Sequence, residues 1–122
     1  MDEKRRQKGV ELFGEVYCHA LGPVPPPGES AFYDYMLETL FGTLWADETL
    51  SIRDRRLLLI GAIAAMGETN TLTIQMRSAF KRGELTAAQL DAIGLFMTQY
   101  VGYPRASQML GVIAQVKSEA QA

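Results

Sequence analysis

The stretch from Leu50 to Pro104 constrains the fold most strongly, because its pattern is typical of three consecutive helices. After a charged first turn, the segment Ile52–Met66 holds only leucine, isoleucine, alanine, glycine and one methionine. A helix that is apolar on all sides has to be buried. We therefore expect this segment to be the central helix of an all-α protein.

The charged first turn of this helix carries Arg53, Arg55 and Arg56 around Asp54. Positive charges are unfavourable near a helix N-terminus, where the helix dipole is itself positive. We therefore expect at least one of these arginines to have a carboxylate partner. Ser51 and Asp54 also have the spacing of a capping box, with aspartate in the acidic position.

Apolar spacings of three and four residues predict six helices and no strand. The predicted helices cover residues 2–20, 30–46, 52–66, 70–81, 87–101 and 104–117. Thr86 and Gln89 form a capping box before the fifth helix. Lys81-Arg82-Gly83 is a typical helix C-terminus.

A chain of 122 residues is expected to form one domain, here residues 1–122. Residues 1–28 comprise the first helix and a proline-rich connector, residues 22–28, and residues 29–118 form the helical core. The second helix is apolar on two faces, and a small protein buries only one of them easily. We therefore expect the other face to contact another subunit.

Composition and charge exclude several classes of function. The net charge of −2 gives no general attraction for nucleic acid, and one cysteine allows neither an intramolecular disulfide nor a cysteine-rich zinc site. The longest apolar run, Leu57–Met66, is about half of the ~20 residues that a membrane span needs. We expect a cytoplasmic protein that binds no metal, no cofactor, no nucleic acid and no membrane.

Gln75 is the first candidate for chemistry, because it shares a helical face with Leu72, Met76 and Ala79. It is either a buried amide bonded to backbone groups or an amide that orients a ligand oxygen. A glutamine cannot shuttle a proton near neutral pH, so any catalytic role would be that of a hydrogen-bond donor.

The other candidates also have structural alternatives. His19, the only histidine, is favoured at a helix C-terminus by the dipole, and its neighbour Cys18 points about 100° away on a helix. Trp45, Tyr100 and Tyr103 either line an aromatic pocket or belong to the core or to an interface.

The chain resembles the carboxymuconolactone decarboxylase family over roughly Phe32 to Ile113. The residues that carry the resemblance are Phe41-Gly42-Thr43-Leu44-Trp45, Leu50-Ser51-x-Arg53-Asp54-Arg55, Leu72-x-x-Gln75-x-x-x-Ala79-x-x-x-Gly83-x-x-Thr86 and Tyr100-x-Gly102-x-Pro104-x-Ala106. The resemblance implies an alkylhydroperoxidase-like array of helices that assembles into a homo-oligomer, a trimer or a hexamer, with pockets near the subunit contacts.

The residues that perform chemistry in this family differ here. The resemblance places Gln75 where the decarboxylases have a histidine and Thr43 where they have a glutamate. The peroxidase branch needs a CxxC followed by a histidine, and this chain has Glu68, Thr71 and Gln75 in that window, with Arg56 in place of a helical glutamate. We therefore reject a cysteine-dependent peroxidase, since no pair of thiols exists.

Two hypotheses remain. In the first, the protein is a decarboxylase that acts on a small cyclic carboxylic acid or lactone, with Gln75, Tyr100 and Glu68 as catalytic residues. Its substrate would then be bound by a further set of side chains: Arg55, Arg56, Thr43, Trp45 and Thr71. In the second, the protein is a non-catalytic small-molecule-binding or structural oligomer that lacks the family's acid–base residues.

Overall fold

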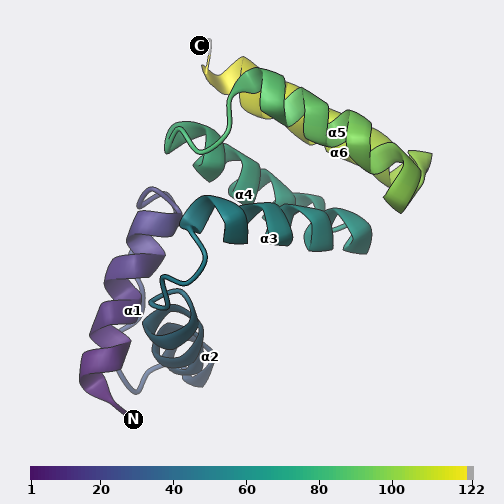
Figure 1. Ribbon diagram of the computed structural model, residues 1–122. Helices are drawn as coiled ribbons and strands as arrows, with labels where there is room; N and C mark the ends of the chain where they lie inside the picture. The colour runs from purple at the N-terminus through teal and green to yellow at the C-terminus, as the bar shows by residue number, and fades with distance from the viewer. Residues whose placement is uncertain (121–122) are drawn as a thin grey trace. The chain divides into compact units, whose positions relative to one another are not determined.

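The computed structural model describes residues 1–120, and this part of the chain is helical with no strand, as predicted (Figure 1). The helices are α1 (Glu3–Val16), α2 (Ala31–Tyr35), η1 (Met36–Leu44), α3 (Ile52–Met66), α4 (Thr69–Lys81), α5 (Ala87–Val101) and α6 (Tyr103–Ala120). The bounds of α3 and α5 are those that the sequence predicts.

The chain divides into two compact units, Met1–Ile52 and Arg53–Ala122. Each unit has its own buried side chains, and each is described by itself below. A single domain over residues 1–122 stays a prediction.

In the first unit, α1 and η1 are in backbone contact at two glycines. A Cβ atom on Gly9 would collide with the carbonyl oxygen of Leu37, and one on Gly42 would collide with the carbonyl oxygen of Arg5. Both positions therefore require glycine, because any side chain would force the two helices apart.

An aromatic cluster forms the core of the same unit. The ring of Phe13 meets Tyr17 and Phe41 edge to face, with centroids 5.4 and 5.1 Å apart. Trp45 stacks on Phe41 at 6.1 Å and is 6% exposed. Such pairs contribute about 0.5–1.5 kcal/mol each beyond the area that they bury.

The first helix ends earlier than the sequence predicts, at Val16 instead of Ala20. Cys18 and His19 have φ values of 57° and 56°, in the left-handed region that a right-handed helix cannot contain. The backbone N–H of His19 then donates to the carbonyl of Gly14 at 2.7 Å. His19 consequently lies beyond the helix, and the prediction of a histidine within its last turn is wrong.

Only the first part of the predicted second helix is an α-helix. Ser30 caps α2 by accepting a hydrogen bond from the N–H of Tyr33 at 3.3 Å, and the chain then continues as the π-helix η1. In η1 the hydrogen bonds span five residues, as between the Trp45 N–H and the Leu40 carbonyl at 2.8 Å. Leu37 and Phe41 are buried, whereas Leu40 and Leu44 are exposed.

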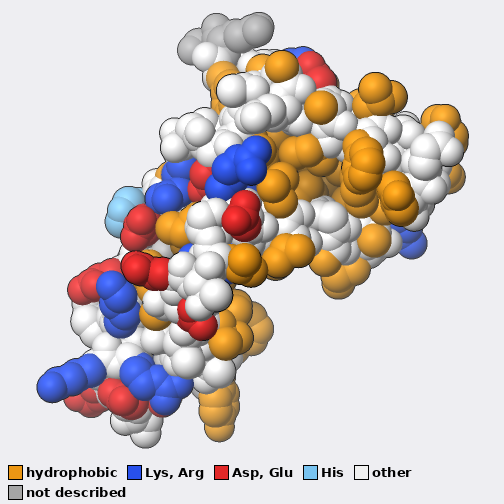
Figure 2. All heavy atoms as spheres, in the orientation of Figure 1, with side chains coloured by type: hydrophobic (Ala, Val, Ile, Leu, Met, Phe, Trp, Pro, Cys, Tyr) orange, Lys and Arg blue, Asp and Glu red, His pale blue; other side chains and the backbone are white. Residues whose placement is uncertain are grey.

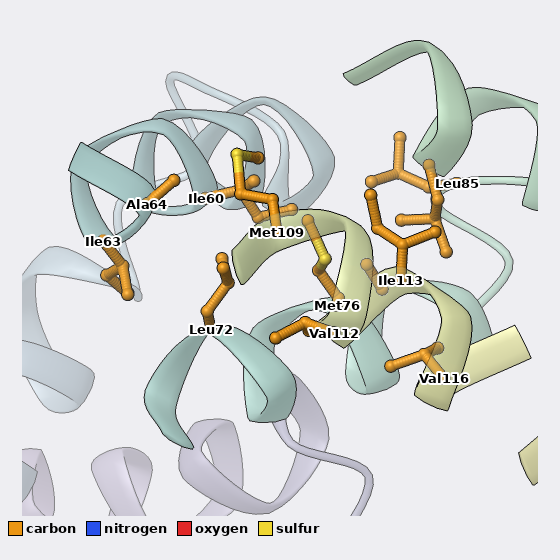
Figure 3. Close-up of a cluster of buried hydrophobic side chains, with 12 residues drawn as sticks. Ile60, Ile63, Ala64, Leu72, Met76, Leu85, Met109, Val112, Ile113 and Val116 are labelled. Carbon is orange, nitrogen blue, oxygen red and sulfur yellow. The ribbon is translucent and has the colours of Figure 1, made fainter. Parts of the chain in front are cut away.

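The core of the second unit gathers side chains from α3, α4 and α6 (Figure 3). Ile60, Ile63 and Ala64 of α3 converge with Leu72 and Met76 of α4 and with four residues of α6, namely Met109, Val112, Ile113 and Val116. One face of α3 thus packs in a core, as predicted, but Leu58 and Met66 are 64% and 71% exposed, so the expectation of burial on all sides is wrong.

The helices of the second unit are joined by caps and ion pairs. Thr86 and Gln89 form the predicted capping box at the start of α5. Helices α5 and α6 lie side by side (Figure 1), and Lys117 of α6 pairs with Asp91 of α5 at 2.9 Å. Among residues 1–120, the structure contains no helix of the length and apolarity that crossing a membrane requires.

Candidate functional site

Two of the predicted site residues, Arg56 and Gln75, meet inside the second unit. Arg56 is 0% exposed and Gln75 is 2% exposed. The Nη1 atom of Arg56, on α3, donates a hydrogen bond to Oε1 of Gln75, on α4, at 2.7 Å. The polar interruption of the apolar face of α4 is therefore matched by a buried charge on α3.

Glu84 is the centre of this network. Its Oε1 accepts from Nε of Arg56 at 2.9 Å, and its Oε2 accepts from Nη2 of Arg56 at 3.3 Å. Oε2 also accepts from Nε of Arg82 at 2.6 Å. The backbone carbonyl of Glu84 accepts from Nε of Arg53 at 2.9 Å. The first turn of α3 thus has its carboxylate partner, as predicted.

Local structure explains how Glu84 reaches this position. Helix α4 ends at Lys81, and Gly83 follows with a φ of 73° in the turn toward α5. A left-handed turn of this kind favours glycine and directs the next residue back along the helix end. The Glu84 side chain is 7% exposed, so the carboxylate lies inside the protein beside Arg56.

We call Arg56, Gln75, Glu84 and Arg82 the arginine network. Moving an arginine and a carboxylate out of water costs several kcal/mol per ion, and good geometry with further hydrogen bonds is needed to offset that cost. Among residues 1–120, no buried side-chain nitrogen or oxygen lacks a hydrogen-bond partner. The network is therefore a structural feature whose buried polar atoms are all hydrogen-bonded.

A comparison with models of protein families assigns the chain to a family. The model of the carboxymuconolactone decarboxylase family matches residues 30–115, which include α2 to α5 and most of α6. The chain belongs to this family. No curated protein and no solved structure matched the chain. The resemblance seen in the sequence is thereby confirmed, together with the all-α fold that it implies.

By the resemblance, Gln75 of the arginine network stands at the position where the decarboxylases have a histidine. The position of the helical glutamate in the peroxidase branch corresponds to Arg56. In this member of the family, an amide and a guanidinium bonded to each other at 2.7 Å occupy these two positions. Neither group transfers protons near neutral pH.

Glu68, a predicted catalytic residue, is the N-cap of α4. Its carboxylate accepts hydrogen bonds from the backbone N–H groups of Asn70 at 3.0 Å and Thr71 at 2.8 Å. Hydrogen bonds from the side chain and the backbone of Thr71 lower the pKa of Glu68 below its ordinary value of 4.5. The carboxylate is ionised at neutral pH, so it is unsuited to donating a proton there.

The remaining predicted residues differ in their burial and in the unit to which they belong. Tyr100 is 76% exposed, and its ring lies 5.3 Å from that of Phe96. Arg55 is half-buried on α3, and Thr71 is exposed. Thr43 and Trp45 belong to the first unit, where the Thr43 hydroxyl donates to the carbonyl of Glu38 at 3.0 Å.

The sequence analysis missed Glu84, although this residue holds the network together. Its only signal in the sequence is its place directly after the helix-ending Gly83. Among residues 1–120, no group of three or more histidine, cysteine, aspartate and glutamate side chains could hold a metal ion.

Proposed function

We propose that this protein is a non-catalytic, self-associating member of the carboxymuconolactone decarboxylase family. The single observation that carries the proposal is the bond between Arg56 and Gln75, both buried to 2% exposure or less. A pair of residues that is already bonded and enclosed stabilises the fold and has no surface to offer a substrate.

The chemistry of decarboxylation sets demands that this network does not meet. Loss of carbon dioxide from a lactone acid leaves an enolate-like anion, which needs hydrogen-bond donors and then a proton on carbon. Gln75, the candidate donor, is only 2% exposed and is bonded to Arg56, and the guanidinium of Arg56 is bonded to Glu84. A substrate carboxylate would have to displace Glu84 in order to reach Arg56.

The test is release of carbon dioxide from a muconolactone carboxylic acid, measured for the wild-type protein and for Gln75→Ala. We expect release at the buffer rate from both proteins. The control is Gln108→Ala, which removes an exposed glutamine from α6. Saturable release by the wild type would contradict the proposal, and a fall of about tenfold or more in Gln75→Ala but not in the control would make Gln75 the oxyanion donor, since loss of one such donor can cost that much.

A second candidate is favoured by the family match over residues 30–115: decarboxylation of a small cyclic carboxylic acid or lactone. In that mechanism Gln75 is the oxyanion donor, and Tyr100 or Glu68 supplies the proton. Thr43, Trp45 and Thr71 then line the substrate site, with Arg55 and Arg56 holding the carboxylate. The carbon dioxide assay distinguishes the two candidates directly.

Self-association is supported by an apolar surface on α5. Leu95, Phe96 and Tyr100 are 73%, 65% and 76% exposed. Residues 92–104 include no charged side chain. Figure 2 shows hydrophobic side chains gathered over α5 and the neighbouring part of α3. Exposed apolar patches that lack charge are typical of the centres of interfaces.

A groove between α3 and α5 adds to this surface. Its volume is about 510 Å³, and its lining is apolar. Leu57 and Ile60 of α3 face Ile93, Phe96 and Met97 of α5 across it. A second copy of the chain presents the same apolar α5 surface, so two copies could cover each other's exposed leucine and aromatic side chains.

Phe96→Glu tests this part of the proposal. A charge at the centre of an apolar interface has to be desolvated, so the variant is expected to be smaller in solution than the wild type. The control is Gln7→Glu, which makes the same change of charge at an exposed position of α1. Light scattering at micromolar concentration gives the mass, and we expect a trimer or a hexamer for the wild type and the control. A monomeric wild type would contradict self-association.

A further inference from the structure

A second cavity lies in the first unit, between α1 and the segment that follows it. Its volume is about 410 Å³, within the range of about 300–1,000 Å³ that small-molecule sites occupy. All of its lining residues fall between Val10 and Val24, so the cavity lies outside the family match over residues 30–115. We call this cavity the α1 cleft.

One wall of the α1 cleft is aromatic and fixed in place. Phe13 and Tyr17 both line it, with ring centroids 5.4 Å apart and ring planes at 73°. Phe41 supports both rings from the core, at 5.1 Å from Phe13 and 5.8 Å from Tyr17. Because the core holds these rings, a ligand would find the aromatic wall already formed.

The opposite wall is fastened to the unit by a buried arginine. This wall includes Leu21, directly before the proline-rich connector, and Val24 within it. Arg6 is 4% exposed, donates to the carbonyl of Pro25 at 2.8 Å and pairs with Asp34 at 2.9 Å. These contacts hold the connector close to α1 immediately after the cleft, and proline restricts its backbone further.

The imidazole of His19 also lines the α1 cleft. Its Nδ1 atom lies against Gly14, where a Cβ atom would be only 2.6 Å away. His19 reaches this place through its left-handed backbone, with φ at 56°. Within residues 1–120 the imidazole has no hydrogen-bond partner, and a neutral imidazole offers one donor and one acceptor.

We propose that the α1 cleft binds a monocyclic phenol. The ring of the ligand packs against Phe13 and Tyr17, and its hydroxyl hydrogen-bonds to the His19 imidazole. An aromatic ring suits a wall of fixed aromatic side chains, since such rings favour edge-to-face and offset contacts. In the described chain, the lining includes no lysine or arginine that would pair with a carboxylate, so a neutral hydroxyl fits better than an acid.

The test is a titration with phenol followed by nuclear magnetic resonance. The chain has one histidine, so the imidazole signals are assigned without ambiguity. We expect saturable shifts of the His19 imidazole and of the Tyr17 amide. Benzene lacks the hydroxyl and cyclohexanol lacks the aromatic ring, so each should bind about fivefold or more weakly, the ratio that one lost hydrogen bond or ring contact gives.

Three variants make the result specific. His19→Ala should weaken phenol about fivefold and leave benzene unchanged, because it removes only the hydrogen bond. Leu21→Trp should fill the cleft and abolish saturation. Leu50→Trp is the matched control, since Leu21 and Leu50 are 43% and 45% exposed and only Leu21 lines the cleft. The proposal would be overturned by shifts that never saturate or by equal affinity for benzene and phenol. It would also be overturned if a folded Leu21→Trp variant bound phenol as tightly as the wild type does.

Discussion

Replacing Glu84 with glutamine tests the arginine network with the least change of shape. The amide has the size of the carboxylate, so packing is retained while the negative charge is lost. Arg56 then keeps its positive charge at 0% exposure, with an amide oxygen in place of an ionised partner. The effect on the free energy of unfolding therefore measures the charge interaction and not a cavity.

The structure supplies an internal comparison, because Glu84 pairs with two arginines of different exposure. The side chain of Arg56 is 0% exposed and that of Arg82 is 25% exposed. Removing one partner of a buried pair costs about 3–5 kcal/mol, and we expect Glu84→Gln near 3 kcal/mol because the amide still accepts one hydrogen bond. Arg82→Gln removes the more exposed arginine and leaves Glu84 paired with Arg56, so a smaller cost of about 1 kcal/mol is expected.

Urea unfolding followed by circular dichroism measures both variants. Small proteins lose about 1–3 kcal/mol of stability per molar urea, so Glu84→Gln should lower the midpoint by about 1–3 M. All proteins must be compared at one protomer concentration, because association stabilises the folded state. The reasoning is refuted if the free energy of unfolding of Glu84→Gln lies within about 1 kcal/mol of the wild-type value. It is also refuted if Arg82→Gln lowers the free energy of unfolding as much as Glu84→Gln does.

Two further predictions concern α4 and α1. Because the pKa of Glu68 is lowered in the folded state, the folded protein binds this proton less readily than the unfolded chain does. The stabilisation that the ionised Glu68 carboxylate provides is therefore present above the unfolded pKa near 4.5, and it is lost as the pH falls through the lower folded pKa. Unfolding at a series of acidic pH values should therefore show a shallower loss of stability for Glu68→Gln than for the wild type; parallel curves would contradict the capping role. Gly9→Ala should destabilise the fold by about 1–3 kcal/mol or more because its Cβ meets the backbone of Leu37, whereas Gly111→Ala, with open space around its Cβ, should gain up to about 1 kcal/mol. Equal thermal midpoints for these two alanine variants would show that α1 and η1 are not in backbone contact.

Local sequence signals predict the second unit well. The apolar run from Leu57 to Met66 predicts the helix α3 and its core face, and Thr86 with Gln89 predicts the start of α5. These features depend on residues close together in the chain. The need for a carboxylate beside the arginines of α3 also follows from the helix dipole alone.

The identity of that carboxylate could not be predicted in the same way. Arg56 and Glu84 are separated by 28 residues, and their contact depends on the left-handed turn at Gly83. The burial of Gln75 was one of two alternatives, since the sequence shows its apolar face but not the guanidinium opposite.

The first unit differs more from expectation. The sequence does not distinguish the π-helix η1 from an α-helix. Hydrogen bonds that span four residues and hydrogen bonds that span five place much the same apolar residues on one face of a short helix. The end of α1 is set by left-handed φ values at Cys18 and His19, which are uncommon for residues other than glycine. These conformations depend on packing against other parts of the unit, which a local pattern does not encode.

The central claim is that the arginine network is closed to ligands, and the Nε–H proton of Arg56 reports on this directly. That proton is donated to Glu84 at 2.9 Å inside the protein. Nuclear magnetic resonance with labelled arginine should show a slowly exchanging Nε–H signal that disappears in Arg56→Lys. The account predicts that a saturating muconolactone carboxylic acid leaves this signal unchanged. A saturable shift of the signal would show that a ligand carboxylate displaces Glu84, and it would contradict the account.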